Sequence, residues 1–264
     1  MDSSPADLAP ADGQPGTVAD PGWPRWARVV IPVLVACTVL LVATGVLLIV
    51  QHRSQAASPV EQLRPTGIPS SVPTGMANLM GLSPVQKRQA PGFVLTDQYG
   101  RTMSLSSLRG KTLVLEFMDP HCTDICPLVS QEFVDAYHDL SPAVAKKVVF
   151  LAVNVNQYHH SVSAVLAFSK EHELVTIPSW KFFTGPVPAL EKVWRAYNIQ
   201  VEAPNPNGDI IHTSIIYFIS PSGTERYVAA PVVDHTAKGV AYLPPAQLAE
   251  WGRGIALVAT HLAR

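Results

Sequence analysis

Charge and cysteine are both scarce in this sequence. Only 15% of the 264 residues are charged, against about 25% in an average protein, and the formal net charge is −1. A chain without excess positive charge lacks the attraction to phosphates on which nucleic-acid binding depends, so nucleic acid is excluded as a partner. Three cysteines are too few for a small disulfide-rich scaffold. The shortage of charge also indicates that part of the chain lies outside water.

The longest stretch without charge covers residues 29–50, VVIPVLVACTVLLVATGVLLIV. At about 1.5 Å per residue a helix of this length measures roughly 33 Å, enough to cross the hydrocarbon core of a bilayer. Secretory signal peptides have shorter apolar cores of about 7–15 residues, and no good cleavage site follows this one. The pattern therefore predicts an uncleaved transmembrane signal-anchor helix at 29–50, in which Cys37 is a packing residue.

The segments on either side of this span differ from a folded domain in composition. Residues 1–28 are rich in Pro, Ala, Asp and Gly without apolar periodicity, which predicts a disordered tail. Residues 51–90 repeat Pro and Gly, which predicts an extended linker. Met76 and Met80 are then ordinary linker residues, although their thioethers also suit a soft metal ion. Equal numbers of arginines flank the span, so the positive-inside rule gives no orientation.

Residues 91–264 are long enough to build one core. Two apolar runs, Thr112–Met118 and Lys147–Val155, are typical of strands buried in a central sheet. Helical patterns cover residues 126–140, 160–172, 187–197 and 244–263, and hairpins are predicted around residues 93–104 and 214–229. Strands alternating with helices predict an α/β fold with a mixed central sheet flanked by helices.

The segment DPHCTDICP (residues 119–127) follows the first central strand, where open α/β sheets carry their sites. On a regular helix Cys122 and Cys126 would be too far apart for a relaxed disulfide. Pro120 and Pro127 interrupt that helix, which places Cys122 in the loop and Cys126 at the helix start, whose positive end stabilises a thiolate. Such a pair can close into a disulfide, or open and chelate a metal ion. Two thiolates and an imidazole suit Cu(I) and tolerate Cu(II), whereas structural zinc normally takes four protein ligands.

The string FMDPHCTDICP (residues 117–127) resembles the copper-site motif of the Sco/SenC family, approximately F-x-Y-T-x-C-P-D-x-C-P. The string HTSIIYFISPSG (residues 212–223) is similar to the family pattern H-S-x-x-x-Y-L-I-D-P-x-G. The resemblance runs along most of residues 91–235 and implies a thioredoxin-like fold. It also implies a copper site formed by Cys122, Cys126 and His212.

The chain departs from the family pattern at several positions. Asp119 and the following proline stand where Tyr-Thr is usual, Thr123 replaces a proline, and Ile211 precedes the ligand histidine in place of Asp. Residues 154–160 replace an acidic D-T-P segment. These departures concern recognition of the delivery partner more than the metal site. Asp119 and Asp124 are candidates for orienting the ligands, and capping the helix is an alternative for Asp124.

Other histidines compete for the role of metal ligand. His235, in the string VDHT, mimics the family's V-D-H-S but is not followed by the expected strand and hairpin, so His212 is preferred. His121 adjoins the first motif cysteine and is either a solvated loop residue or a group that tunes the thiolate pKa. His159 and His160 are adjacent, so their side chains diverge, which favours a solvated helix start over a metal site.

Two functions of different classes fit these residues. The resemblance implies a copper-binding chaperone that passes copper to the binuclear copper centre of cytochrome c oxidase. The alternative is an enzyme, a thiol–disulfide oxidoreductase in which one cysteine attacks a partner disulfide and the other resolves the mixed disulfide. His212 discriminates between them, because a reductase has little need of it. A peroxiredoxin-type peroxidase is disfavoured, because Asp119 stands where its motif has proline.

Either function predicts that the domain at 91–264 lies outside the cytoplasm, where copper enzymes mature and thiol pairs cycle. The tail at 1–28 is then cytoplasmic, and the anchor at 29–50 makes the chain a single-pass membrane protein. The expected partner is a copper-accepting oxidase subunit or another exported thiol protein.

Overall fold

The computed structural model describes residues 24, 30, 31, 33, 37–45, 65–206, 208 and 210–264. Residues 37–45 are helical. Within the described part of the chain, no helix is long and apolar enough to cross a membrane. The rest of the predicted anchor at 29–50 lies outside the described residues, apart from residues 30, 31 and 33, and so does the predicted tail at 1–28, apart from residue 24. The membrane span therefore stays a prediction.

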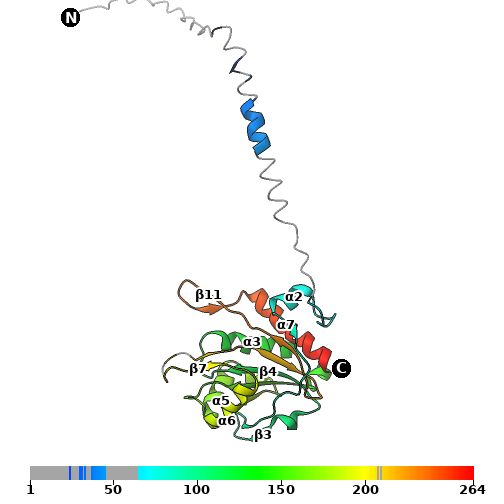
Figure 1. The fold of residues 1–264 in the computed structure, drawn as a ribbon, viewed down its shortest axis with the longest axis vertical. Coiled ribbons are helices and arrows are strands. Elements are labelled where there is room, and N and C mark those ends of the chain that lie inside the picture. The colour runs from blue at the N-terminus through cyan, green and yellow to red at the C-terminus, as the bar shows by residue number, and fades with distance from the viewer. Residues whose placement is uncertain are drawn as a thin grey trace, which may run out of the picture. The chain divides into compact units, whose positions relative to one another are not determined.

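A six-stranded mixed sheet forms the centre of the domain (Figure 1). The strand order is β1-β10-β9-β4-β5-β6; β4, β5 and β6 run parallel, whereas β9, β10 and β1 are antiparallel to their neighbours. Their bounds are Ser83–Pro84 (β1), Glu225–Ala229 (β10), Ile216–Ile219 (β9), Thr112–Met118 (β4), Val148–Asn154 (β5) and Lys181–Phe183 (β6). Every residue of β4 and β5 is buried, as expected for strands covered on both faces.

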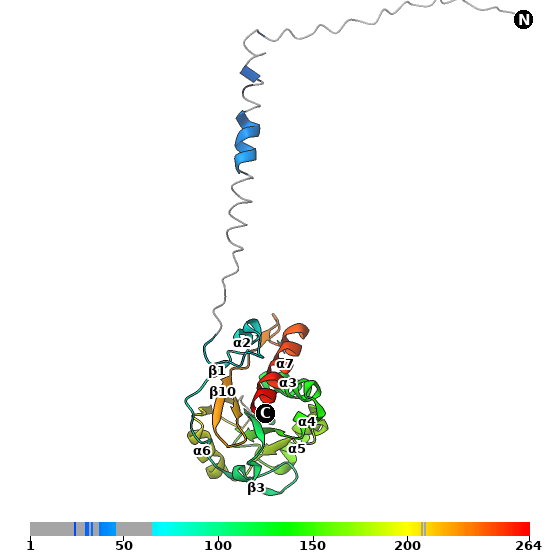
Figure 2. The ribbon, with the colours of Figure 1, turned by 90° about the vertical axis from the view of Figure 1, so that its right-hand side faces the viewer.

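Helices cover both faces of this sheet (Figure 2). On one face pack α3 (Ile125–Asp139), α5 (Val162–Glu171) and α7 (Pro245–Leu262). On the other pack α6 (Val187–Ala196), the hairpin of β2 (Val94–Thr96) and β3 (Thr102–Ser104), and the short helix η1 (Leu105–Leu108). Two further short helices, α4 (Pro142–Ala145) and η2 (Leu174–Thr176), lie in connections. The α/β fold with a mixed sheet and flanking helices is confirmed.

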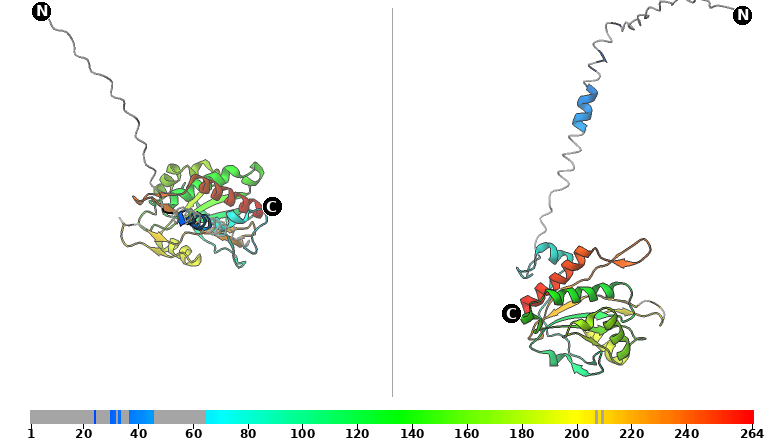
Figure 3. Two further views of the ribbon diagram at one scale, coloured as in Figure 1. Left: turned by 90° about the horizontal axis from the view of Figure 1, so that it is seen from above. Right: turned by 180° about the vertical axis from the view of Figure 1, so that it is seen from behind.

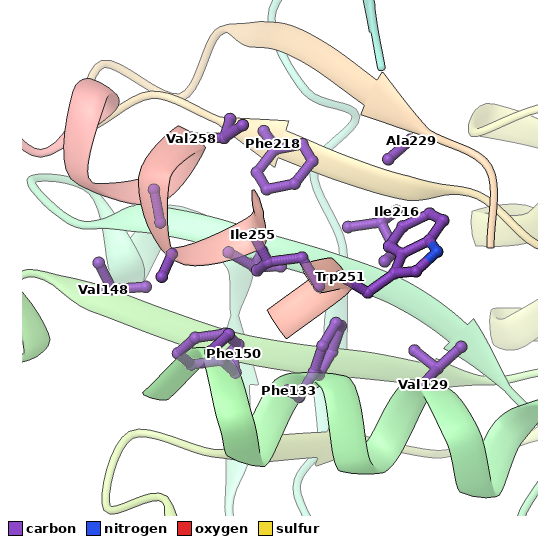
Figure 4. Close-up of a cluster of buried hydrophobic side chains, with 14 of the residues drawn as sticks. Val129, Phe133, Val148, Phe150, Ile216, Phe218, Ala229, Trp251, Ile255 and Val258 are labelled. Atoms are coloured by element: carbon purple, nitrogen blue, oxygen red, sulfur yellow. The ribbon is translucent and has the colours of Figure 1, made fainter. Parts of the chain in front are cut away.

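The larger half of the core lies between α3, α7 and the sheet. Figure 4 shows side chains of the two helices meeting those of the strands, among them Val129, Phe133, Phe150, Phe218, Trp251 and Ile255. The two helices approach closely at Gly252 of α7, where an added Cβ would lie 2.6 Å from the Cβ of Asp135 in α3. Since α3 begins at the cysteine motif, this packing fixes the helix that carries Cys126.

The structure differs from the predicted linker at 51–90. Residues 74–79 form the helix α2 (Thr74–Leu79), and residues 83–84 are the edge strand β1. Met76 and Met80 are buried, and both contact the position of Gly254 in α7. The folded domain therefore includes residues 65–90. Frequent proline and glycine concealed a set of apolar residues that pack against the last helix.

Besides the β2–β3 hairpin, two further short hairpins lie beyond the central sheet. One pairs β7 (Val201–Glu202) with β8 (Ile211–His212), and the other pairs β11 (Asp234–His235) with β12 (Ala241–Tyr242). Figure 3 shows the β11–β12 hairpin protruding from the body of the domain. The hairpin predicted around 214–229 begins later than expected, since its first strand, β9, starts only at Ile216. Both hairpins carry a candidate ligand histidine.

Candidate functional site

An open cleft of about 960 Å³ lies at the carboxyl end of β4. Its lining includes Cys122 and Asp124 from the cysteine motif, His212 from β8, and His235 from β11. Segments far apart in the sequence thus meet at the point where the parallel strands end. The cysteine motif and both competing histidines share one cleft.

The two motif cysteines lie next to each other as free thiols. The N–H of Cys126, in the first turn of α3, donates to Cys122 Sγ over 3.4 Å. The N–H of Cys122 donates to the carbonyl oxygen of Asp119 over 3.1 Å, which closes the turn after β4. Cys122 is half-buried and lines the cleft, whereas Cys126 is only 2% exposed and lies beneath it.

These surroundings make the two thiols unequal. A hydrogen bond from the Cys126 thiol, supported by the backbone N–H groups of Cys126 and Asp124, lowers the pKa of Cys122 to about 7, against the opposing effect of burial. The same hydrogen bond, together with burial, raises the pKa of Cys126. The prediction that the helix start stabilises a thiolate at Cys126 is wrong, because the lowered pKa belongs to Cys122 in the loop, whose sulfur accepts from the Cys126 N–H. Cys122 is therefore the more nucleophilic cysteine near neutral pH.

His212 is oriented by the backbone beside it. Its Nδ1 lies 3.1 Å from the carbonyl oxygen of Thr213. Since a carbonyl can only accept a hydrogen bond, Nδ1 carries the proton and Nε2 presents a lone pair. Burial lowers the pKa of His212, which favours the neutral ring. A neutral imidazole with an available nitrogen is the form that binds metal ions.

His235 lies at the exposed rim of the cleft. Its Nε2 is 2.9 Å from Oδ1 of Asp124, and about half of each side chain is exposed. Asp124 stands at the N-cap position of α3 but accepts no capping hydrogen bond, so the alternative prediction that it caps the helix is wrong. His235 is the last residue of the two-residue strand β11, and after a loop only the two-residue strand β12 pairs with it. The Asp124 contact joins this hairpin to the cysteine loop.

A polar cluster that the sequence did not reveal supports the cysteine loop from below. Asp119 is buried, and its Oδ1 accepts from the His121 N–H and from Asn156 Nδ2, both over 2.8 Å. The rings of His121 and His159 stack with centroids 3.6 Å apart. His121 and His159 thus contact each other and are not simply solvated. The one available signal was the joint departure from the family pattern at position 119 and at residues 154–160.

The site residues are only partly assembled for metal binding. Among the residues that the structure describes, no group of three or more His, Cys, Asp or Glu side chains lies close enough together to hold a metal ion. The predicted pair of Cys122 and Cys126 is in contact, and His212 lines the same cleft. Two members of the predicted ligand set are adjacent, and the third is nearby.

Sequence relatives point to one family. A family model described as SCO1/SenC matches residues 83–237. The chain is 25% identical over 133 residues to a SCO1 protein homolog of Bacillus subtilis, covering 50% of this chain and 68% of the relative. It is 27% identical over 145 residues to the mitochondrial SCO2 homolog of Bos taurus, covering 52% of this chain and 53% of the relative. The identity is low, so the relationship is distant.

Solved structures agree on the fold. A SCO1/SenC family lipoprotein from Bacillus anthracis superimposes with a TM-score of 0.54 at 20% identity, covering 69% of this chain and 98% of that one. Copper-bound ScoI of Bradyrhizobium japonicum gives a TM-score of 0.51 at 22% identity, covering 66% of this chain and 99% of that one. The fold is therefore thioredoxin-like, as predicted. The family match, which extends over more than half of the sequence and includes both motifs, shows that this chain belongs to the SCO1/SenC family.

Proposed function

We propose that this chain is a membrane-anchored copper chaperone that delivers copper to the binuclear copper centre of cytochrome c oxidase. The observation that carries the proposal is the adjacent pair of Cys122 and Cys126, with a low pKa at Cys122, in a cleft shared with His212. Two thiolates and one imidazole are a soft donor set that suits copper. Copper is bound in the Bradyrhizobium japonicum relative, which supports the choice of metal.

Copper is the cargo of this proposed reaction, and each ligand has a separate task. Cys122 is partly exposed, so an incoming or outgoing ligand can reach it. Cys126 is buried, so it would retain the metal while the other ligands exchange. Binding by all three residues requires His212 to approach the thiols from its place on β8. Exchange of thiolates between chaperone and acceptor would then drive transfer.

Titration of the full chain in detergent with Cu(I), in the presence of a competing chelator, tests this function. We expect one tightly bound copper per chain, with the affinity reduced in His212→Ala. The matched control is His235→Ala, a histidine in the same cleft whose loss should leave the affinity within about threefold of wild type. Absence of copper binding, with the two thiols reduced and intact, would refute the chaperone function.

A thiol–disulfide oxidoreductase is the second candidate, and the inequality of the two thiols favours it. An attacking thiolate with a pKa near 7 beside a buried resolving thiol suits disulfide exchange. Cys122 would attack a partner disulfide, and Cys126 would then displace the partner. The partner leaves with two thiols, while Cys122 and Cys126 are oxidised to a disulfide. Reduction of a disulfide in an exported protein, by a chain that binds no copper, would establish this function instead.

The proposed location is the extracytoplasmic side of a membrane, with the chain anchored by the span at 29–50 and the tail at 1–28 in the cytoplasm. The chemistry of the cysteine pair supports this orientation, because thiol pairs of this kind cycle outside the cytoplasm. The expected acceptor is an oxidase subunit or another exported thiol protein. Protease is added to cells whose outer layers are permeable but whose anchoring membrane is intact. It should digest the domain and spare the tail, and survival of the intact domain would refute the orientation.

A further inference from the structure

One acidic residue interrupts the apolar strand that leads to the cysteine motif. Glu116 belongs to β4, where every other residue except the initial threonine is apolar, and it is only 1% exposed. Its side chain points to the same face of the sheet as those of Val114 and Met118, which join the core beneath α3 and α7. Burying a carboxyl group is unfavourable unless its hydrogen bonds are made. Its contacts should therefore show what it contributes.

Every hydrogen bond that the structure gives to the Glu116 carboxyl group goes to Oε1. This oxygen accepts from the N–H of the following residue, Phe117, over 3.0 Å. It also accepts from the Ile215 N–H over 3.2 Å and from the Ser214 hydroxyl over 3.4 Å. Oε2 has no partner among the described residues. The carboxyl therefore connects the strand before Cys122 with the segment directly after His212.

This connection replaces a piece of the sheet. Backbone pairing between β4 and β9 covers Leu113–Ile219, Val114–Phe218 and Leu115–Tyr217, and no further pair is formed. One residue beyond the last pair, the Glu116 carboxyl accepts a hydrogen bond from Ile215, directly before the chain enters β9. His212 lies three residues before Ile215, on β8, and lines the cleft. The segment that carries His212 therefore has no backbone pairing with β4, but the Glu116 side chain links it to that strand.

A second buried carboxyl group provides a contrast. Glu132 of α3 is 0% exposed, and neither of its oxygens has a partner among the described residues. Burial raises the pKa of Glu116 to about 8, and the pKa of Glu132 is raised as well, by burial and by the charge of Glu116. The two groups share burial and low polarity, but only Glu116 contacts the segment that carries His212.

We infer that Glu116 is a positioning residue for His212. Its carboxyl group fixes residues 214–215, directly after β8, to the strand that leads to the cysteine pair. The inference rests on the proposed copper function, because it concerns the distance between the imidazole and the thiols. The hydrogen bonds of the Glu116 carboxyl go to Phe117, Ser214 and Ile215 and to none of the proposed ligands, although its charge contributes to the raised pKa of Cys126. Glu116 sets the position from which His212 approaches the cysteine pair.

The test compares Cu(I) affinity, measured by chelator competition, in the full chain in detergent and in its variants. Glu116→Leu removes the acceptor, and we expect an affinity loss of about ten- to hundredfold, as for other groups that orient ligands. Glu116→Gln keeps an oxygen at this position and should stay within about threefold of wild type. Glu132→Leu is the matched control for removing a buried carboxyl group, and it should change the affinity less than about twofold.

A double-mutant cycle separates positioning from general damage. In a His212→Ala background, Glu116→Leu should change Cu(I) affinity less than about twofold, because the group on which it acts is gone. An equal loss in both backgrounds would overturn the inference, and so would wild-type affinity in Glu116→Leu. If wild type itself binds no copper, the proposed function fails and the inference falls with it. If wild type binds and the cycle shows no coupling, only the inference fails.

If Glu116→Leu does not fold, as judged by the absence of a cooperative unfolding transition, Ser214→Ala provides the test instead. This substitution removes one donor to the Glu116 carboxyl and leaves the buried acid in place. Loss of one hydrogen bond should weaken Cu(I) binding about threefold, again only while His212 is present. Affinity equal to wild type in Ser214→Ala would count against the inference.

Discussion

The thiol half and the histidine half of the cleft are built differently. Cys122 lies between a fully buried seven-residue strand and a 15-residue helix, Cys126 lies in the first turn of that helix, and hydrogen bonds fix both of them. The histidines lie on two-residue strands of small hairpins outside the sheet. The thiol half is therefore preorganised, whereas the proposed copper function requires the histidine half to close on it. The contrast suggests that the thiols determine reactivity and the histidines modulate it.

The largest expected effect is on thiol reactivity. Alkylation of wild type by iodoacetamide should accelerate with rising pH through a midpoint near 7, the pKa of Cys122, because only the thiolate reacts. In a Cys37→Ser background, which removes the third free thiol, Cys122→Ser should lower the rate at pH 7 more than about a hundredfold, since Cys126 is buried with a raised pKa. Cys126→Ser retains a hydroxyl donor and serves as the control. Equal rates in both variants would show that the thiols are equivalent.

The next effect separates the two histidines. His212→Ala should weaken Cu(I) binding about ten- to hundredfold, because it removes a soft-metal ligand of the proposed set. His235→Ala removes a ring that is already engaged by Asp124 at the rim. The comparison is measured by chelator competition at one pH. A larger loss in His235→Ala would exchange the roles of the two hairpins and make the V-D-H-T string the ligand segment.

A third effect probes the support of the thiol half. Gly252→Ala should destabilise the domain by about 1–3 kcal/mol, because the new methyl group would meet the Asp135 Cβ at 2.6 Å and the Ala136 backbone nitrogen at 3.2 Å. Urea unfolding of wild type and Gly252→Ala measures the change in the free energy of unfolding.

Gly254→Ala, two residues further along α7, is the control. Its methyl group would meet the side chains of Met80 and Met76, which can shift, so the loss should stay below about 1 kcal/mol. A greater loss in Gly254→Ala would mean that α2 supports the site more than the contact between α3 and α7 does.

The same contrast explains which features the sequence could predict. Strands such as Thr112–Met118 were predictable because a continuous apolar run needs cover on both faces, and the cysteine motif follows from its spacing and its prolines. The two hairpins were not, since two-residue strands carry no periodic signal. The role of Glu116 depends on partners almost a hundred residues away. Contacts of that kind follow from the three-dimensional fold and leave no local pattern.

The smallest expected effect concerns the contact that joins the two halves. Asp124→Asn removes the charge that faces His235, and both side chains are about half exposed. Exposed ion pairs contribute little, so the free energy of unfolding should change by less than about 1 kcal/mol. Alkylation of Cys122 should rise less than about twofold, because the β11–β12 hairpin is held by its own pairing as well. A severalfold rise in the alkylation rate would instead identify the Asp124–His235 contact as the element that restricts access to the reactive thiol.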